Sequence, residues 1–222
     1  MLLVLVGLWW VGSDILNRAG PNAGKGLPRL PTLTTTPRVT SGGGTHSHET
    51  PAANVKTIQR LGGKVDYGKI DPHSGQRSGI AATITPAMVK AADQDQLGSE
   101  ADPAIHPPGW DQLPSRNRAR GHLLGRQLGG SGENPANLVT LYQLRANSPV
   151  MRDYESMLAD AVAAGQTVNY QVQPLYTSPT DNGPPRAVRL RAQGNRGFRF
   201  DVEIANTPQA TVKEYIPPTQ TP

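Results

Sequence analysis

The chain has 222 residues, 36% of them hydrophobic, which is enough for one domain of ordinary size with a core of its own. Its formal net charge of +5 and its pI near 9.7 suit a polyanionic partner. It contains no cysteine, so thiol catalysis, a disulfide scaffold and cysteine-ligated zinc fingers are excluded.

Residues 1–12 form an apolar segment, LLVLVGLWWV, that ends at a glycine and polar residues. The run is about half of the roughly 20 residues that a membrane-spanning helix needs. It suits either the core of a signal peptide, although no Lys or Arg precedes it, or the remaining half of a membrane helix. Both interpretations predict a secreted or membrane-tethered extracellular protein.

Residues 13–54 are rich in Pro, Gly, Thr and Ser and have almost no periodic apolar pattern. Such a segment buries too little surface to offset its ordering entropy, so it is interpreted as a flexible linker, and His46 and His48 within it as inert. Residues 55–206 have the pattern of a folded domain. Residues 207–222 are polar and proline-rich and are expected to trail as a tail.

The domain opens with two predicted strands at residues 64–70 and 78–85, joined by a Pro/Gly turn. Thr85 and Pro86 are an N-cap and first-turn pair, which predicts a short helix. The acids that follow form a polar loop, and His106 lies in a stiff, proline-rich segment after it. Three further strands are predicted near the C-terminus, at residues 168–175, 187–192 and 198–204.

The central stretch, residues 117–155, carries the residues that suggest chemistry. His122 ends a strand predicted at residues 119–124, in a run with four arginines and no acid, and a Gly/Asn-rich loop follows. A second run, residues 186–199, has five arginines and no acid. The two runs either flank one binding groove or are solvated arginines on loops and strand edges. The first run comprises Arg116, Arg118, Arg120 and Arg126.

A helix is predicted to begin at Ser148 and Pro149 and to end near Gly165. By position alone, Asn147 at its entrance is best explained as an N-terminal cap. Asn137, which precedes the apolar LVTLY, is by position a brace for the loop backbone. Glu155 lies eight residues after Asn147 and therefore faces roughly the same side of the helix.

The segments RGH, LGGSG, NPANLVTLYQ and NSPVMRDYE, in this order, resemble the DNA/RNA non-specific endonuclease family of ββα-metal nucleases, in its streptodornase-like branch. The resemblance implies an α+β fold, with a ββα-metal core and a mostly antiparallel sheet. It also implies that His122 is the general base, Asn147 the metal ligand, Asn137 the supporting asparagine and Glu155 the helix glutamate. The family's Asp-Arg-Gly-His motif has Ala119 at its first position here.

In the mechanism that this resemblance implies, neutral His122 takes a proton from the water that attacks phosphorus. Mg²⁺, with Mn²⁺ as an alternative, is held by Asn147 and waters. Arg120 is expected to neutralise phosphate charge, and Arg118 and Arg126 to position the nucleic-acid backbone. Glu155 orders metal-bound water, and the products carry 5′-phosphates. His106 is the alternative general base.

The sequence therefore predicts a metal-dependent endonuclease that cleaves DNA, with RNA as a second substrate, without sequence preference. It would act as a free secreted DNase or as the toxin domain of an exported protein, and the toxin interpretation adds an immunity or inhibitor protein as a partner. The alternative from another class is a non-catalytic nucleic-acid-binding module at a cell surface. A binding module needs the arginines but has no use for the pair His122 and Asn147.

Overall fold

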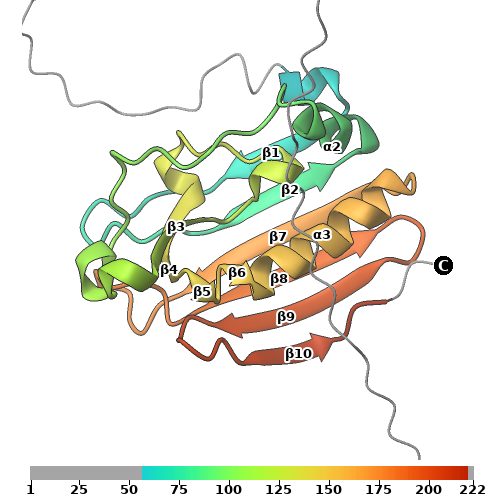
Figure 1. Cartoon of the computed structure of the whole chain (residues 1–222). Coiled ribbons are helices and arrows are strands. Elements are labelled where there is room, and N and C mark those ends of the chain that lie inside the picture. The colour runs from blue at the N-terminus through green and yellow to red at the C-terminus, as the bar shows by residue number, and fades with distance from the viewer. Residues whose placement is uncertain (1–56, 220–222) are drawn as a thin grey trace, which may run out of the picture. The chain divides into compact units, whose positions relative to one another are not determined.

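The computed structural model describes residues 57–219 (Figure 1). The apolar segment, the linker, His46 and His48 lie outside these residues. Within residues 57–219, no helix is long and apolar enough to cross a membrane.

One six-stranded sheet forms the base of the domain, and all of its neighbouring strands pair antiparallel. The sheet order is β1-β2-β7-β8-β9-β10. This confirms the predicted α+β class with a mostly antiparallel sheet. The strands are β1 (Lys64–Tyr67), β2 (Ile80–Ile84), β7 (Val168–Leu175), β8 (Ala187–Gly194), β9 (Arg199–Ala205) and β10 (Val212–Ile216).

A second layer covers one face of this sheet (Figure 1). It contains an antiparallel hairpin, two helices and a short parallel strand pair between them. Four 3₁₀ helices shape the connections, at Trp110–Gln112, Ser115–Asn117, Arg126–Leu128 and Pro135–Asn137. The elements of the second layer are α2 (Pro86–Asp93), β3 (Arg118–His122), β4 (Leu138–Tyr142), β5 (Leu144–Arg145), β6 (Ser148–Pro149) and α3 (Val150–Ala163).

The start of α2 agrees with the prediction from Thr85 and Pro86. The Thr85 hydroxyl accepts a hydrogen bond from the Met88 amide, and Pro86 occupies the first turn, where its missing N–H costs nothing. Met88 is fully buried beneath the helix. The capped helix is thereby held against the sheet.

The core lies between the sheet and α3. The strands alternate buried and exposed residues, so one set of side chains on each strand points into this core. Leu190 of β8 and Val202 of β9 are fully buried with Leu158 of α3. Arg189 and Arg191 alternate with these residues and therefore lie on the opposite, outer face of the sheet. The face toward α3 is therefore apolar, and the outer face carries charged side chains.

The segment after Thr207 differs from the prediction of a trailing tail. Residues 212–216 form β10, which pairs with β9 through positions such as Val212 and Ile204. All five residues of β10 are exposed. Since backbone pairing at a sheet edge requires no alternation of apolar residues, the hydrophobic pattern carried no signal for this strand.

Candidate active site

His122 ends β3 and points its ring at the loop that follows α2. Its Nε2 lies 3.0 Å from the carbonyl oxygen of Ser99. Because a carbonyl can only accept, this contact requires the proton on Nε2 and leaves Nδ1 of the neutral ring as an acceptor. Burial lowers the pKa of His122; the hydrogen bond to Ser99 and the charge of Glu100 raise it, and Arg126 lowers it, each to a smaller extent than burial. The imidazole is thus neutral near pH 7, as a general base requires.

His122 faces a polar pocket of about 640 Å³. Asn147 and Glu155 line the same pocket, so the structure brings together three residues that are separate in sequence. The pocket is bounded by the β3 end, the loop after it, the β4–α3 connection and the first turns of α3. Its other polar lining residues are Asp93, Asp95, Glu100, Arg126, Gln127, Gln143, Ser148 and Arg152.

Asn147 is not an N-terminal cap. The helix begins at Val150, not at Ser148, and no residue of the described chain caps it through a side chain. The backbone carbonyl of Ala146 instead accepts from the Met151 amide, which satisfies a first-turn donor without a side chain. Ser148 and Pro149, predicted to open the helix, form the short strand β6 beside β5.

The Asn147 amide is oriented by its neighbours. Its Nδ2 donates to Gln143 Oε1 at 3.0 Å, and no residue between 57 and 219 donates to its Oδ1. A Cβ added at Gly121 would lie 3.2 Å from that oxygen, so the glycine before His122 lets the amide approach β3. An unpaired carbonyl oxygen beside the histidine is a ready ligand for a hard cation.

Glu155 is buried in the pocket wall and fixed to the loop after β3. Its Oε1 accepts from the Gly125 amide at 2.8 Å. Burial raises the pKa of Glu155 to about 8, against a smaller lowering by the Gly125 hydrogen bond. A Cβ at Gly125 would lie 2.3 Å from Glu155 Oε2, so this glycine is required for the close approach. The carboxyl therefore has one fixed oxygen and one beside the pocket.

Asn137 does not line the pocket, although the resemblance places it in the catalytic group. It is fully buried. Its Oδ1 accepts from the Leu124 amide at 2.8 Å, and its Nδ2 donates to the carbonyls of Leu124 and Ser131 at 3.0 Å each. All of its hydrogen-bonding capacity is thus used on the loop backbone, as the bracing interpretation expects.

Arg120 also lies outside the pocket lining, and its expected role at the phosphate stays a prediction. Its Nε donates to the Ile105 carbonyl at 2.6 Å and its Nη2 to the Pro103 carbonyl at 2.5 Å, with the guanidinium 4.1 Å from the Trp110 ring centroid. Arg118 likewise donates to the Trp110 carbonyl and pairs with Asp111. Both arginines hold the preceding loop, which carries Ser99, against β3.

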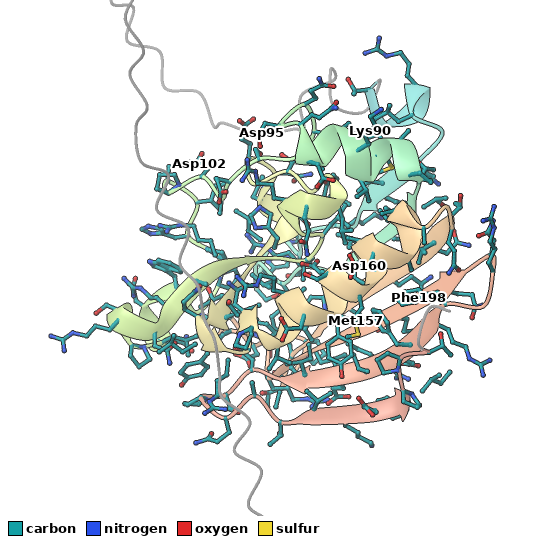
Figure 2. All side chains as sticks on the ribbon, turned by 45° about the vertical axis from the view of Figure 1, so that its right-hand side comes forward. Lys90, Asp95, Asp102, Met157, Asp160 and Phe198 are labelled. Atoms are coloured by element: carbon teal, nitrogen blue, oxygen red, sulfur yellow. The ribbon has the colours of Figure 1, made fainter. Side chains whose placement is uncertain are left out.

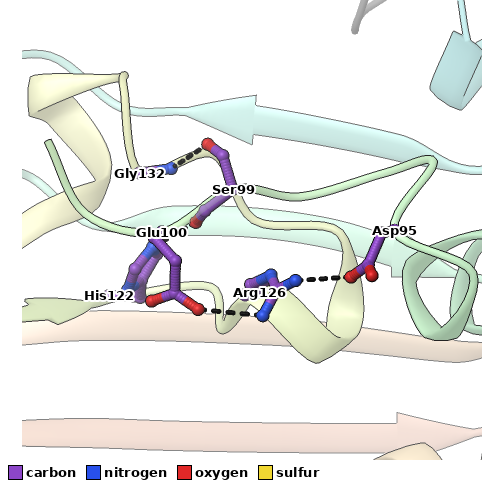
Figure 3. Close-up of polar contacts among 6 residues, drawn as sticks. All are labelled: Asp95, Ser99, Glu100, His122, Arg126 and Gly132. Atoms are coloured by element: carbon purple, nitrogen blue, oxygen red, sulfur yellow. Dashed lines mark hydrogen bonds and ion pairs between the residues drawn. The ribbon is translucent and has the colours of Figure 1, made fainter.

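Arg126 lines the pocket, but acids engage it. It pairs with both Asp95 and Glu100, and Figure 3 shows the guanidinium between the two carboxylates. Asp95 lies just beyond the end of α2, as Figure 2 shows. The run is free of acids in sequence but not in space, because the loop after α2 supplies them.

The second arginine run lies on the other side of the sheet. Arg189 donates twice to Asp201, at 2.8 and 2.9 Å, and Arg191 approaches the same carboxylate at 3.3 Å. Since the sheet separates Arg189 and Arg191 from His122, their positions favour the alternative of arginines on strand edges over a groove flanked by both runs.

Among the groups at the site that were not predicted as site residues, three contact or adjoin His122 and Asn147 in space or in sequence. The Ser99 carbonyl is a backbone group, which no residue pattern reveals. Gln143 precedes Asn147 by four residues and Arg152 follows it by five, and both line the pocket. Their polar side chains beside the asparagine were the signal that could have identified them.

A β-hairpin and a packed helix that place a neutral imidazole opposite a free amide oxygen define a ββα nuclease fold. The family model for DNA/RNA non-specific endonuclease matches residues 55–194, and the chain belongs to this family. It is therefore a nuclease with nucleic acid as its substrate class. A search of curated proteins found no match to this chain.

Solved structures show the same fold. NucA from Streptococcus agalactiae with a magnesium ion bound is 23% identical, with a TM-score of 0.54 over 68% of this chain and 78% of that chain. The same nuclease without metal has a TM-score of 0.52 at the same identity and coverage. The Sda1 nuclease with a bound zinc ion is 20% identical, with a TM-score of 0.51 over 65% of this chain and 75% of that one.

Proposed function

We propose that this nuclease is a metal-dependent endonuclease that hydrolyses DNA, and RNA as a second substrate, without sequence preference. The observation that carries the proposal is the pairing of His122 with Asn147 in one pocket. The first is a neutral imidazole with Nδ1 left to accept a proton, and the second is an amide oxygen without a protein donor among residues 57–219.

The residues present fit a hard, largely hydrated cation better than a structural zinc ion. No group of three His, Cys, Asp or Glu side chains within residues 57–219 could hold a metal. Asn147 Oδ1 and the free oxygen of Glu155 are hard oxygen donors, which Mg²⁺ and Mn²⁺ accept with waters completing the shell. Such an ion supplies Lewis acidity at the phosphate and at the departing 3′ oxygen. Asn147 would hold it directly, and Glu155 through water.

In the proposed reaction, Nδ1 of His122 takes a proton from a water molecule, and the water oxygen attacks phosphorus. The bond between phosphorus and the 3′ oxygen breaks, and that oxygen takes a proton from solvent, which leaves a 5′-phosphate and a 3′-hydroxyl. The Ser99 carbonyl stabilises the imidazolium that forms, because it accepts from the ring's other N–H. Asn137 keeps the loop at Leu124 in place. Ser99 is held by its amide, which donates to the Gly130 carbonyl, and by its hydroxyl, which accepts from the Gly132 amide (Figure 3).

Location and biological setting are part of the proposal. The apolar segment at residues 1–12 supports a secreted or membrane-tethered nuclease. A free DNase and the toxin domain of a larger exported protein both fit a non-specific activity. The toxin setting would require an immunity protein that covers the pocket.

Digestion of a supercoiled plasmid tests the function. With Mg²⁺ or Mn²⁺ we expect nicked, linear and then fragmented DNA, and no cleavage after chelation. The ends should accept label from polynucleotide kinase only after phosphatase treatment. His122→Ala should slow cleavage by about 10²–10⁴-fold while DNA binding stays within a few-fold, since the imidazole transfers a proton and does not attract charge.

Two results would contradict the proposal. Digestion by His122→Ala at the parent rate would remove His122 as the base, and the exposed His106 would be tested next. Binding of DNA without cleavage under any divalent metal would leave the non-catalytic binding module.

A further inference from the structure

Most arginines of the run at residues 116–126 already have partners within the protein. Arg118 and Arg126 are engaged by acids, and Arg120 by backbone carbonyls and Trp110. A phosphate would have to compete with these partners. Cations without such partners are better suited to bind it.

Arg152 is such a cation. It lies in the first turn of α3, is exposed and lines the catalytic pocket. No carboxylate within residues 57–219 pairs with its side chain, in contrast to Arg126 across the same pocket. Its full charge is therefore available to a phosphate.

The connection between β4 and α3, whose Gln143 and Asn147 line this pocket, also carries two exposed side chains, those of Leu144 and Arg145. In Figure 1 this connection lies at the start of α3, where β5 and β6 are labelled. Leu144 is 62% exposed, more than any other large hydrophobic residue of the described chain. Arg145 is also exposed, has no ion pair within residues 57–219, and adopts a left-handed backbone with φ of 80°. That conformation strains a residue with a side chain, and strain of this kind is concentrated at functional sites.

The connection is also held firmly, so the exposure of Leu144 and Arg145 is a fixed feature. The Leu144 amide donates to Asn117 Oδ1 at 2.6 Å, and β5 pairs with β6. On the pocket side, the side-chain amide oxygen of Gln143 accepts a hydrogen bond from the side-chain amide of Asn147. The same short segment thus positions the candidate metal ligand and presents an apolar and a cationic side chain to solvent.

We propose that Leu144, Arg145 and Arg152 form a substrate rim that grips nucleic acid on either side of the scissile phosphate. Arg145 and Arg152 contact backbone phosphates, and Leu144 packs against sugar and base edges. This inference rests on the proposed function for the identity of the substrate, but it concerns binding and not the chemical step. The arginine runs apparent in the sequence would then serve structure, and the rim would supply substrate affinity.

Salt dependence of DNA binding tests the rim, with all variants made in a His122→Ala background so that the DNA stays intact. Each phosphate contact contributes about 0.9 to the slope of log affinity against log salt for duplex DNA. Arg145→Gln and Arg152→Gln should each lower that slope by about one unit and weaken binding several-fold at low salt. Leu144→Ser should weaken binding at every salt concentration with an unchanged slope, because it removes no charge.

Arg199→Gln is the matched control, since Arg199 is an exposed arginine on the outer side of β9 that has no ion pair within residues 57–219. It should leave both slope and affinity at the parent values. The rim is overturned if Arg145→Gln and Arg152→Gln behave like Arg199→Gln. Because the readout is binding, a parent protein that fails to cleave would count against the proposed function and not against the rim.

Discussion

The two faces of the sheet carry similar kinds of side chain in opposite states of pairing. On the outer face, Arg189 and Arg191 line a hollow of about 280 Å³, but both are paired with Asp201. On the α3 face, the larger pocket holds the amide oxygen of Asn147 and the guanidinium of Arg152, neither of which has a partner in the described part of the chain. Since the outer face also carries Arg199, which no carboxylate of the described residues pairs, the α3 face is distinguished by the unpaired oxygen of Asn147 in one pocket with His122, and not by unpaired cations as such.

Two carboxyl groups show the same contrast. Hydrogen bonds from Arg189 lower the pKa of Asp201, which therefore stays ionised as part of a closed network. Burial without a cation raises the pKa of Glu155 to about 8. A carboxyl whose charged form lacks a partner is costly to maintain, and such groups gather at sites where a ligand completes them. Glu155 is thus a buried carboxyl in the pocket wall whose ionised form no cation of the described chain pairs.

Of the changes considered, replacement of Asn147 should reduce the cleavage rate most. Asn147→Ala removes the free amide oxygen, and cleavage should slow by about 10²-fold or more as the candidate ligand is lost. Since Asn147 caps no helix, unfolding stability should change by less than the roughly 0.5–2 kcal/mol of a lost cap. Rates and thermal melts of the same samples check both statements.

Asn147→Asp sharpens the result. Aspartate keeps an oxygen donor, and the Gln143 amide can flip to donate to it. We expect a folded enzyme whose rate depends differently on Mg²⁺ concentration, because a carboxylate adds charge to the ion's shell. A parent-like metal titration at full rate would remove Asn147 from the site.

Replacing Asn137 should give the converse outcome. Asn137→Ala leaves the Leu124 amide and the Leu124 and Ser131 carbonyls without partners in the core, which should cost about 2–4 kcal/mol of stability. Urea unfolding measures that loss. The rate per folded molecule should fall less than in Asn147→Ala. Unchanged stability with lost activity would return Asn137 to the catalytic group.

The next largest effect is expected from acidification. The acidic side of the pH–rate profile should follow the protonation of His122. Burial lowers its pKa below the ordinary 6.5, so activity should hold down to about pH 6.5 and fall about tenfold per pH unit below the His122 pKa. By linkage, the unfolded chain takes up this proton first, so folded stability should decrease as pH falls through 6.5. A limb centred above pH 6.5 would contradict this.

A comparison of melting temperatures isolates the histidine. The parent and His122→Ala contain the same other titrating groups, so the difference between their curves against pH belongs to His122. The parent should lose stability relative to the variant on acidification. Equal curves would mean that His122 is solvated in the folded protein.

How far the sequence predicts this molecule depends on the kind of interaction involved. The strands and α2 follow from alternation and from Thr85 with Pro86, because these are local signals. The ββα arrangement around His122 and Asn147 follows from the motif order. β10 has no burial pattern, and the partners of Arg120 and Arg126 come from a loop distant in sequence. Local patterns do not encode such pairings.

Substitutions on the outer face of the sheet should have the smallest effect on stability and on DNA binding. They test directly whether the two faces differ in function. Arg189→Gln removes one partner of Asp201, but Arg191 remains beside the same carboxylate. A half-buried pair at the sheet surface contributes about 1 kcal/mol, and Arg191 still neutralises Asp201, so the melting temperature should change little. The salt slope of DNA binding should equal that of the parent, because the sheet lies between Arg189 and the pocket. A shallower slope for both Arg189→Gln and Arg191→Gln would contradict this. It would mean that nucleic acid also contacts the outer face, where the two arginines would have to leave Asp201 to bind phosphate.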